Sequence, residues 1–142
     1  MSINVSNKVS KRDIDIIHRY LSEHSYWAKN IPRDVVERSI ENSLCFAAHD
    51  AGEHVGFARA ITDYAVFAYI ADVFVLESHR GRGISKQLME AVRRHPQLQG
   101  LRRWSLVTSD AHDLYRQFGF SELASPEKHM EDVALNPYAR GR

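Results

Sequence analysis

Apolar and polar positions follow two different periods along the chain, and these periods predict the order of the elements. From Ser10 to Leu21 the apolar residues recur at helical spacing, and Ser10 is a suitable N-cap. Pro32 suits the first turn of a second helix that extends to about Asn42. Short apolar runs bounded by turn residues follow, and these runs are typical of strands. The pattern therefore predicts helices over 10–21 and 32–42 that precede most of the sheet.

The middle of the chain carries the clearest strands. Residues 44–62 read as two strands joined by the turn Asp50-Ala51-Gly52-Glu53. Residues 66–76 are apolar at nearly every position, so we place them in a central strand covered on both faces. Further strands are expected at 3–6, 104–108, 120–124 and 129–133, the last two as a final hairpin, with a short helix capped by Ser109 and ended by Gly119.

A glycine-rich turn follows the central strand. Residues 73–76 lead into Arg80-Gly81-Arg82-Gly83-Ile84-Ser85, after which apolar residues recur at helical spacing up to His95. The glycines let the backbone turn sharply and bring N–H groups to one anion, while the helix adds its positive N-terminal end. A Walker loop and a dinucleotide fingerprint both require a different glycine spacing. The segment predicts a phosphate-binding loop of another kind.

Two segments resemble those of a known family, the GCN5-related N-acetyltransferases (GNATs). Arg80-x-x-Gly83-x-Ser85 resembles the family motif Arg/Gln-x-x-Gly-x-Gly/Ala, with Ser85 as a mild departure. The run from Leu114 to Phe120 resembles the segment Leu-Tyr-x-x-x-Gly-Phe that closes the family's core. The resemblance covers roughly residues 44–124. It implies one domain over 1–142 with an α/β (α+β) fold, in which about four helices flank a mixed, strongly twisted sheet of six to seven strands.

The same resemblance implies acetyl-CoA as the cofactor. Its pantetheine arm would lie where the central strand and the next strand splay apart, and would pair with the backbone of 73–75 like an added strand. Its pyrophosphate would lie on the amides of 80–85. The implied cofactor-binding residues are Val73, Phe74, Val75, Arg80, Gly81, Arg82, Gly83, Ile84, Ser85 and Thr108, where many relatives have an asparagine in place of Thr108.

Two side chains are candidates for acid and base work. Tyr115 occupies the tyrosine position of the closing segment, which implies that it protonates the departing thiolate, and packing on the apolar face of its helix is the alternative. An alkyl amine with a pKa of about 10.4 is protonated at neutral pH, so a proton must leave before it attacks. Some relatives carry a glutamate where this chain has Ala71, which leaves Asp72 as the candidate base. The alternatives are that Asp72 is a structural carboxylate, hydrogen-bonded at the strand or at a bulge in it, and that a chain of ordered waters carries the proton. An N–H near Val75 is the implied oxyanion donor.

The acceptor wall is implied by the family's plan. The segment between the first two helices and the later hairpins usually form it, which points to Tyr26, Trp27 and Tyr64. Core packing is the alternative for each of these side chains. If they line the site, the acceptor carries an apolar or aromatic portion beside its amine.

Composition excludes several other classes. The 19 Lys and Arg nearly balance the 18 Asp and Glu, so a general attraction to nucleic acid or to an anionic membrane is not indicated. The chain shows no signal peptide and no apolar run of membrane-spanning length, so we expect a cytoplasmic protein. Cys45, the single cysteine, lies in an apolar run without an activating base. The eight histidines show no metal-ligand spacing, so no metal site is expected.

These observations lead to one expected function and one alternative. We expect an acetyl-CoA-dependent N-acetyltransferase that transfers the acetyl group directly, in a ternary complex, to a primary amine of a small molecule or peptide. The alternative is a catalytically weak acyl-CoA-binding or sensing module with a regulatory or partner-binding role, which Ala71 favours and Tyr115 opposes. Because relatives pair through exposed strands or tails, a homodimer is a further expectation.

Overall fold

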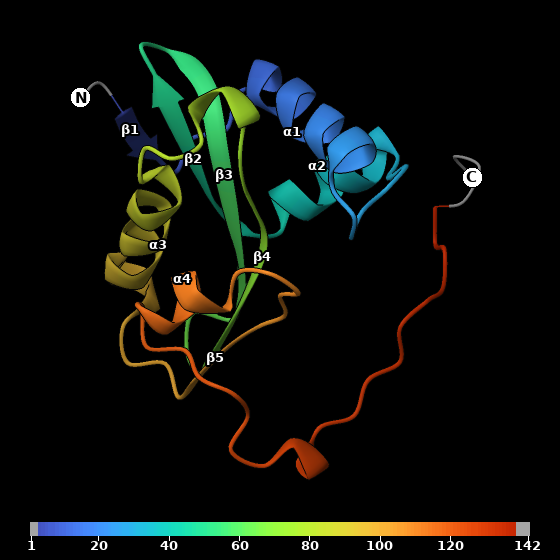
Figure 1. Cartoon of the computed structure of the whole chain (residues 1–142), viewed down its shortest axis with the longest axis vertical. Coiled ribbons are helices and arrows are strands. Elements are labelled where there is room, and N and C mark those ends of the chain that lie inside the picture. The colour runs from blue at the N-terminus through green and yellow to red at the C-terminus, as the bar shows by residue number, and fades with distance from the viewer. Residues whose placement is uncertain (1–2, 139–142) are drawn as a thin grey trace.

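The structure is a computed structural model that describes residues 3–138 of the 142-residue chain. Its centre is one mixed sheet in which the strands follow chain order (Figure 1). The strands are β1 (Ile3–Ser6), β2 (Leu44–Asp50), β3 (Glu53–Thr62), β4 (Phe67–Val75) and β5 (Arg103–Leu106). The first four pair with one another in antiparallel fashion, whereas β5 runs parallel to β4. The strand expected over 66–76 is thus β4, which lies between β3 and β5.

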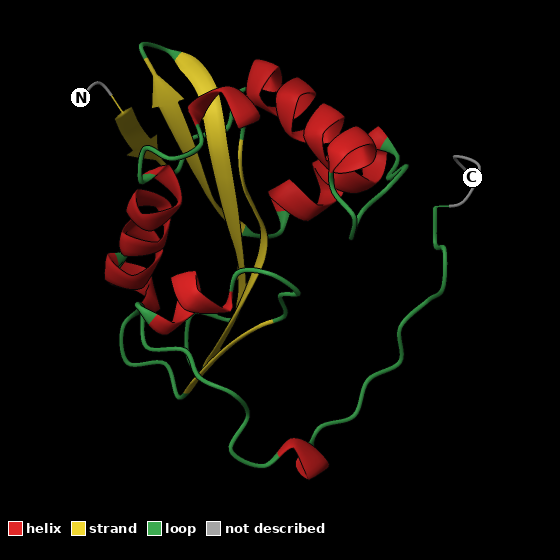
Figure 2. Cartoon of the chain, viewed as in Figure 1, coloured by secondary structure: helices red, strands yellow, loops and turns green. Residues whose placement is uncertain are grey.

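Helices cover both faces of this sheet (Figure 2). They are α1 (Lys11–His24), α2 (Arg33–Glu41), α3 (Ile84–Arg94) and α4 (His112–Arg116). One apolar cluster joins α1 and α2 to the sheet through Ile17, Val36 and Phe57. A second cluster joins α3 and Tyr115 of α4 to the opposite face through Phe46 and Leu88. The four helices agree with the expectation from the resemblance, and no helix within residues 3–138 is long and apolar enough to cross a membrane.

The expected final hairpin is wrong. Within the described residues the sheet has five strands rather than six to seven, and neither 120–124 nor 129–133 forms one. The chain makes a short 3-10 turn at Pro126–Lys128, and no residue from 121 to 138 belongs to a strand. A strand needs a neighbouring strand to satisfy its backbone groups, and residues 121–137 do not lie beside one in this chain. Composition alone does not reveal that missing neighbour.

Cys45 is packed in the core, as the sequence indicates. Only 4% of it is exposed, and burial raises the pKa of its thiol to about 11. Its Sγ lies 3.6 Å from the Ile40 carbonyl oxygen, on the α2 side of the sheet. This thiol therefore stays protonated at neutral pH and is a poor nucleophile.

A β-bulge interrupts the pairing of β3 with β4. Phe57 pairs with Phe74 and Arg59 pairs with Ala71, so two residues of β4, Asp72 and Val73, lie opposite one residue of β3. Asp72 adopts the left-handed region with φ of 55°, which is uncommon for a residue other than glycine. Such a bulge bends the strand and increases its twist.

The strand separates from β5 at the same point. The β4–β5 ladder begins at Phe67↔Arg103 and ends at Ile70↔Leu106. Beyond Ile70, the β5-facing edge of residues 71–75 has no neighbouring strand in the described chain. The splayed strands expected from the resemblance are therefore present, and they leave a row of backbone groups open.

Side chains hold the bulge in place. The Nε of Arg59 donates to Asp72 Oδ2 over 3.0 Å, and the Arg59 guanidinium also donates to Ser43 Oγ over 2.9 Å. The indole Nε1 of Trp27 donates to the other oxygen, Asp72 Oδ1, over 2.8 Å. The charged side chains of Arg59 and Asp72 are only 14% and 12% exposed, so each depends on the other for solvation.

A second polar cluster fastens the start of α1 to the sheet. Asp13 closes a capping box with Ser10, and its Oδ1 accepts hydrogen bonds from His49 Nε2 at 2.8 Å and His54 Nδ1 at 3.0 Å. These three groups are of types that bind metals, which the spacing along the sequence did not indicate. The distances are those of hydrogen bonds. If His54 Nδ1 donates its proton to Asp13, the buried Nε2 of His54 carries no proton and lies near the rings of Phe57 and Phe74. This arrangement suits a neutral imidazole.

Burial and hydrogen bonding shift the pKa values of Asp13 and His54, and these shifts couple the stability of the fold to pH. Burial alone would raise the pKa of Asp13, but hydrogen bonds from Ser10, His49 and His54 outweigh it and lower that pKa to about 2. Burial lowers the pKa of His54 below its ordinary value of 6.5, against the opposing effect of Asp13. In both cases the group binds a proton at a higher pH in the unfolded chain than in the folded chain, so falling pH favours unfolding.

We therefore expect two losses of stability as pH falls. The free energy of unfolding should decrease below pH 6.5 because of His54, and by a further amount of about 2 kcal/mol between pH 3.8 and 2 because of Asp13. Urea denaturation across this range measures both. His54→Gln, which keeps a neutral donor, should reduce the first loss, whereas His129→Gln on the exposed segment should not. If the free energy of unfolding falls equally with pH in His54→Gln and in the parent chain, the first loss does not come from His54.

The Arg59–Asp72 pair gives a second stability prediction. Arg59→Leu leaves the Asp72 carboxylate buried without its cation, so the free energy of unfolding should fall by about 3 kcal/mol. Arg38→Leu removes a cation from an exposed pair with Asp34 and should cost less than about 1 kcal/mol. Denaturant titration of both variants makes the comparison. Similar small losses in both would show that the pair does not hold the bulge.

Candidate active site

The open edge of β4 forms one wall of a cleft of about 470 Å³. The glycine-rich turn closes one end of this cleft, and α4 forms the opposite wall. Its lining includes most of the expected cofactor residues, namely Val73, Phe74, Val75, Arg80, Gly81, Gly83, Ile84 and Ser85, together with Tyr115. The structure thus brings into one cavity residues that the sequence suggested separately.

The glycine-rich turn has the backbone that its sequence predicts. Gly81 and Gly83 have φ of 80° and 75°, and a Cβ placed on either would meet no heavy atom within 4 Å, so the turn is open on that side. Gly83 is the N-cap of α3, and the first amides of a helix have no partner within the helix. Together these features make a concave surface that suits an anion.

Arg80 and Arg82 do not both face the cleft. Arg80 folds back, with its Nε donating to the Val75 carbonyl at 3.1 Å and its guanidinium donating to the Tyr20 hydroxyl at 3.0 Å. The Tyr20 ring stacks on Phe74 at 4.1 Å, so Arg80 ties the turn to α1 and β4. Arg82 is half exposed, lies 3.9 Å from Asp50 and does not line the cleft.

A second, smaller cleft of about 240 Å³ adjoins the first between β4 and the chain that follows β5. Tyr69, Asp72 and Thr108 line it, and Val73 and Tyr115 line both clefts. Thr108 therefore lies outside the cleft that contains the glycine-rich turn. Its Oγ1 accepts from the amides of Asp110 and Ala111 and shapes the entry to α4.

Tyr26 and Trp27 form a strap across both clefts. Tyr26 is 62% exposed and its hydroxyl is hydrogen-bonded to Ser109 Oγ at 2.7 Å, while Trp27 reaches Asp72 on β4. The two rings meet edge to face at 5.0 Å. Because these exposed side chains link the α1–α2 connection to β4 and to the chain that follows β5, core packing does not explain them. Ser109 is engaged by this strap and does not cap α4, contrary to the expectation from the sequence.

Tyr115 lies where the two clefts meet. It is 8% exposed, and burial, with the charges of Asp110 and Tyr26, raises its pKa to about 12. The hydroxyl therefore holds its proton at neutral pH. A buried phenol in this state can donate a proton or a hydrogen bond but cannot act as a base.

Tyr64 lies apart from this arrangement. It occupies the turn between β3 and β4 with φ of 62°, is 47% exposed and lines neither cleft.

The sequence did not single out three residues of the site, Tyr20, His24 and Arg59. The first two line the larger cleft from α1, and Arg59 orients Asp72. Their only signal is proximity in the fold, because α1 and β3 are distant in sequence from the glycine-rich turn.

Comparison with known proteins places this geometry in a family. Residues 41–122 match the model of the acetyltransferase (GNAT) domain. A solved structure of a GNAT-family protein from Xanthomonas campestris is 53% identical, covers 96% of each chain and superposes with a TM-score of 0.93. FG08082 of Gibberella zeae, whose name also contains the word acetyltransferase, is 29% identical over 133 residues, or 78% of this chain and 74% of that protein.

A more distant structure shows the fold alone. It is an aminoglycoside acetyltransferase from an uncultured soil metagenomic sample, 21% identical, with 95% of this chain and 99% of that chain covered and a TM-score of 0.68. The matched segment contains β2 to β5, the glycine-rich turn, α3 and α4, which supply most of the lining of both clefts, whereas Tyr20, His24, Tyr26 and Trp27 lie outside it. The chain belongs to the GNAT acetyltransferase family.

Proposed function

We propose that this protein is an acetyl-CoA-dependent N-acetyltransferase that acts on a primary amine of a small molecule or peptide. The observation that carries the proposal is the larger cleft, which has an open strand edge along its side, an anion-binding turn at one end and the protonated Tyr115 at the other. These three features suit the pantetheine amides, the pyrophosphate and the thioester of one elongated cofactor. Family membership supports the same cofactor.

The chain's own residues have distinct tasks in this proposal. The backbone of 73–75 would hold the pantetheine arm, and the amides from Gly81 to Ser85 would hold the pyrophosphate. Acetyl-CoA would supply the activated acetyl thioester when bound. Tyr115 would hold a proton at its hydroxyl and give it to the departing thiolate, because its own pKa of about 12 keeps it protonated until then. A backbone N–H near Val75 would be the donor to the developing oxyanion.

The smaller cleft is the proposed acceptor site. Asp72 offers negative charge there to an ammonium group, and Tyr26 and Trp27 offer aromatic surface beside it. Both Asp72 oxygens already accept hydrogen bonds, from Trp27 and Arg59, yet an ionised carboxylate has about four acceptor positions and can take another. We propose Asp72 as the base, with a water path from the cleft as the alternative route for the proton. Tyr64 has no task in this proposal because it lines neither cleft.

Direct transfer in a ternary complex fits the position of Cys45. Its thiol is buried on the α2 side of the sheet and lines neither cleft. A covalent acetyl-cysteine stage is therefore not part of the proposal. The alternative, an acyl-CoA-binding module without turnover, is favoured by Ala71 in place of a glutamate and by the engagement of Asp72 with Arg59.

The test is thiol release from acetyl-CoA across polyamines, aminoglycosides, arylalkylamines, amino acids and peptides. We expect release with one amine class, and a fall of about 10²-fold in kcat for Tyr115→Phe at saturating substrates, because general acid catalysis is lost. Tyr64→Phe removes a hydroxyl outside both clefts and serves as the matched control, with full turnover expected. Full turnover in Tyr115→Phe would remove the tyrosine from the mechanism.

Calorimetric titration with acetyl-CoA separates the two functions. Binding accompanied by amine-dependent release supports the transferase, whereas binding without release on any amine supports the sensing module. Asp72→Asn should retain binding of acetyl-CoA while it lowers kcat/KM for the amine. If its kcat/KM follows the same pH profile as the parent chain, the water path replaces Asp72 as the route for the proton.

A further inference from the structure

The smaller cleft carries a carboxylate on each of its two walls. Asp72 lies on the β4 wall, and Asp110 lies on the opposite wall, in the chain between β5 and α4. Among the described residues that line this cleft, none is a lysine, an arginine or a histidine. An acceptor with a carboxylate of its own would therefore meet like charge and no cation. The lining favours an acceptor that carries positive charge beyond its reacting amine.

The two carboxylates differ in what already surrounds them. Asp72 is paired with Arg59 and accepts from Trp27, so much of its charge is balanced by a cation that does not line the cleft. The Asp110 carboxylate is exposed, and it accepts no hydrogen bond and forms no ion pair within the described part of the chain. Burial and, after it, the charge of Asp110 raise the pKa of Tyr115. Asp110 is thus the uncompensated charge beside the proposed acid.

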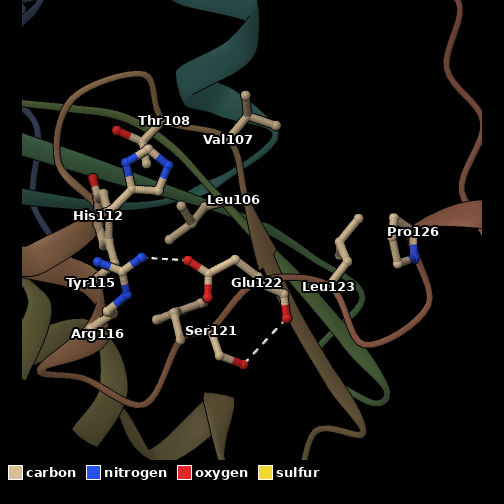
Figure 3. Close-up of a pocket in the computed structure, with 11 residues that line it drawn as sticks. Leu106, Val107, Thr108, His112, Tyr115, Arg116, Ser121, Glu122, Leu123 and Pro126 are labelled. Carbon is tan, nitrogen blue, oxygen red and sulfur yellow. Dashed lines mark hydrogen bonds and ion pairs between the residues drawn. The ribbon is translucent and has the colours of Figure 1, made fainter.

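The guanidinium of α4 does not neutralise Asp110. Arg116 and Asp110 line the same exposed hollow, but Arg116 donates to Asp113 over 3.1 Å and to Glu122. Figure 3 shows the contact with Glu122 along a groove of about 410 Å³ that shares part of its lining with the smaller cleft. His112 lines the groove and the hollow but not the smaller cleft. The charge of Asp110 is therefore available to a ligand.

Hydrogen bonds fix the backbone that carries Asp110. The Oγ1 of Thr108 accepts from the amides of Asp110 at 3.3 Å and of Ala111 at 3.0 Å. The preceding residue, Ser109, is hydrogen-bonded to the Tyr26 hydroxyl through both its amide and its Oγ. A carboxylate on a backbone held in this way loses little conformational freedom when it binds a cation.

Aromatic rings supply much of the remaining lining. Tyr26, Trp27 and Tyr69 line the smaller cleft, and aromatic faces attract ammonium groups and cover methylene chains. The cleft of about 240 Å³ is smaller than the range of about 300 to 1,000 Å³ that holds drug-sized ligands. A short alkyl chain with an ammonium group at each end matches this size, this apolar surface and this charge.

We propose that the acceptor is a short aliphatic diamine, and that Asp110 selects it by binding the ammonium group that does not react. Asp72 keeps its proposed task with the reacting amine. This inference rests on the proposed function, because it names the acceptor of the acetyl transfer.

The reaction balances with one charge left on the product. A C–N bond forms between the reacting nitrogen and the acetyl carbon, and the C–S bond of the thioester breaks. The nitrogen loses two protons: one leaves through Asp72 or the water path, and the other replaces the proton that Tyr115 gives to the thiolate. The ammonium group at Asp110 keeps its protons throughout, so the monoacetylated product remains a cation.

A pair of isosteric amines tests the selection. Putrescine has an ammonium group at each end of its alkyl chain, and pentylamine has a methyl group in place of one of them. We expect kcat/KM of the parent chain to be about tenfold higher for putrescine, because the second ammonium forms a charge-assisted contact with Asp110. Asp110→Asn should remove most of this preference. Equal values for the two amines in the parent chain, or an unchanged preference in Asp110→Asn, would overturn the proposal.

Two further variants show that the charge at this position is responsible. Asp113→Asn removes a 99% exposed carboxylate that lines neither cleft, so it should keep the preference of the parent chain. Asp110→Lys should reverse the preference, because its ammonium group repels the second ammonium of putrescine. A loss of preference in Asp113→Asn equal to that in Asp110→Asn would count against a specific contact with Asp110.

Calorimetric titration in the presence of coenzyme A separates this inference from the proposed function, because it needs no turnover. Putrescine should bind the parent chain with a lower Kd than pentylamine, and Asp110→Asn should lose most of that difference. If this difference is present but no amine is acetylated, the proposed function fails and the selection by Asp110 stands. Equal Kd values for the two amines would contradict the selection even where turnover is observed.

Discussion

Two residues of β4 lie opposite one residue of β3, and the remainder of the site depends on this mismatch. The extra residue bends β4 away from β5 at the position where their ladder ends, so the β5-facing edge of residues 71–75 stays open. An open edge inside a sheet is unfavourable unless something else satisfies its backbone groups. The chain supports the bend with Asp72 in a left-handed conformation, held by Arg59 and Trp27.

The two faces of the sheet contribute differently to the site. On one face α3 packs against β2 and β3, which places the glycine-rich turn at the end of the open edge. On the other face α1 and the connection to α2 supply Tyr20, Tyr26 and Trp27, which cover the gap from outside. Tyr115 reaches the gap from α4 and is buried by both walls. The larger cleft therefore has the anion-binding turn at one end, the protonated Tyr115 at the other and aromatic side chains over it.

The sequence was informative where the signal is local. Helical periodicity, the capping residue Ser10 and the glycines at 81 and 83 are written within a few residues, and the structure has these elements where the pattern places them. The bulge was only one alternative for Asp72, because a single aspartate in an apolar strand does not by itself reveal a change of register with the neighbouring strand. Likewise, the contacts of Asp13 with His49 and His54 join residues that are 36 and 41 positions apart.

The expected final hairpin failed for a different reason. Residues 129–135 have the apolar content of a strand, but a strand is defined by its neighbour, and the neighbour is absent from residues 3–138. Tyr64 lies outside both clefts, a position that the sequence does not reveal because an aromatic residue in a turn gives the same pattern whether it faces a cleft or solvent. Both differences concern surroundings that the pattern along one chain does not encode.

The most direct measurement is a crystal structure of the protein with coenzyme A. The account predicts that the pantetheine arm lies between β4 and β5 with its amides hydrogen-bonded to the backbone of 73–75, its pyrophosphate on the amides of Gly81 to Ser85, and its sulfur beside the Tyr115 hydroxyl. A cofactor bound elsewhere, or a chain in which β5 closes against residues 71–75, would contradict the claim that the Asp72 bulge creates the site.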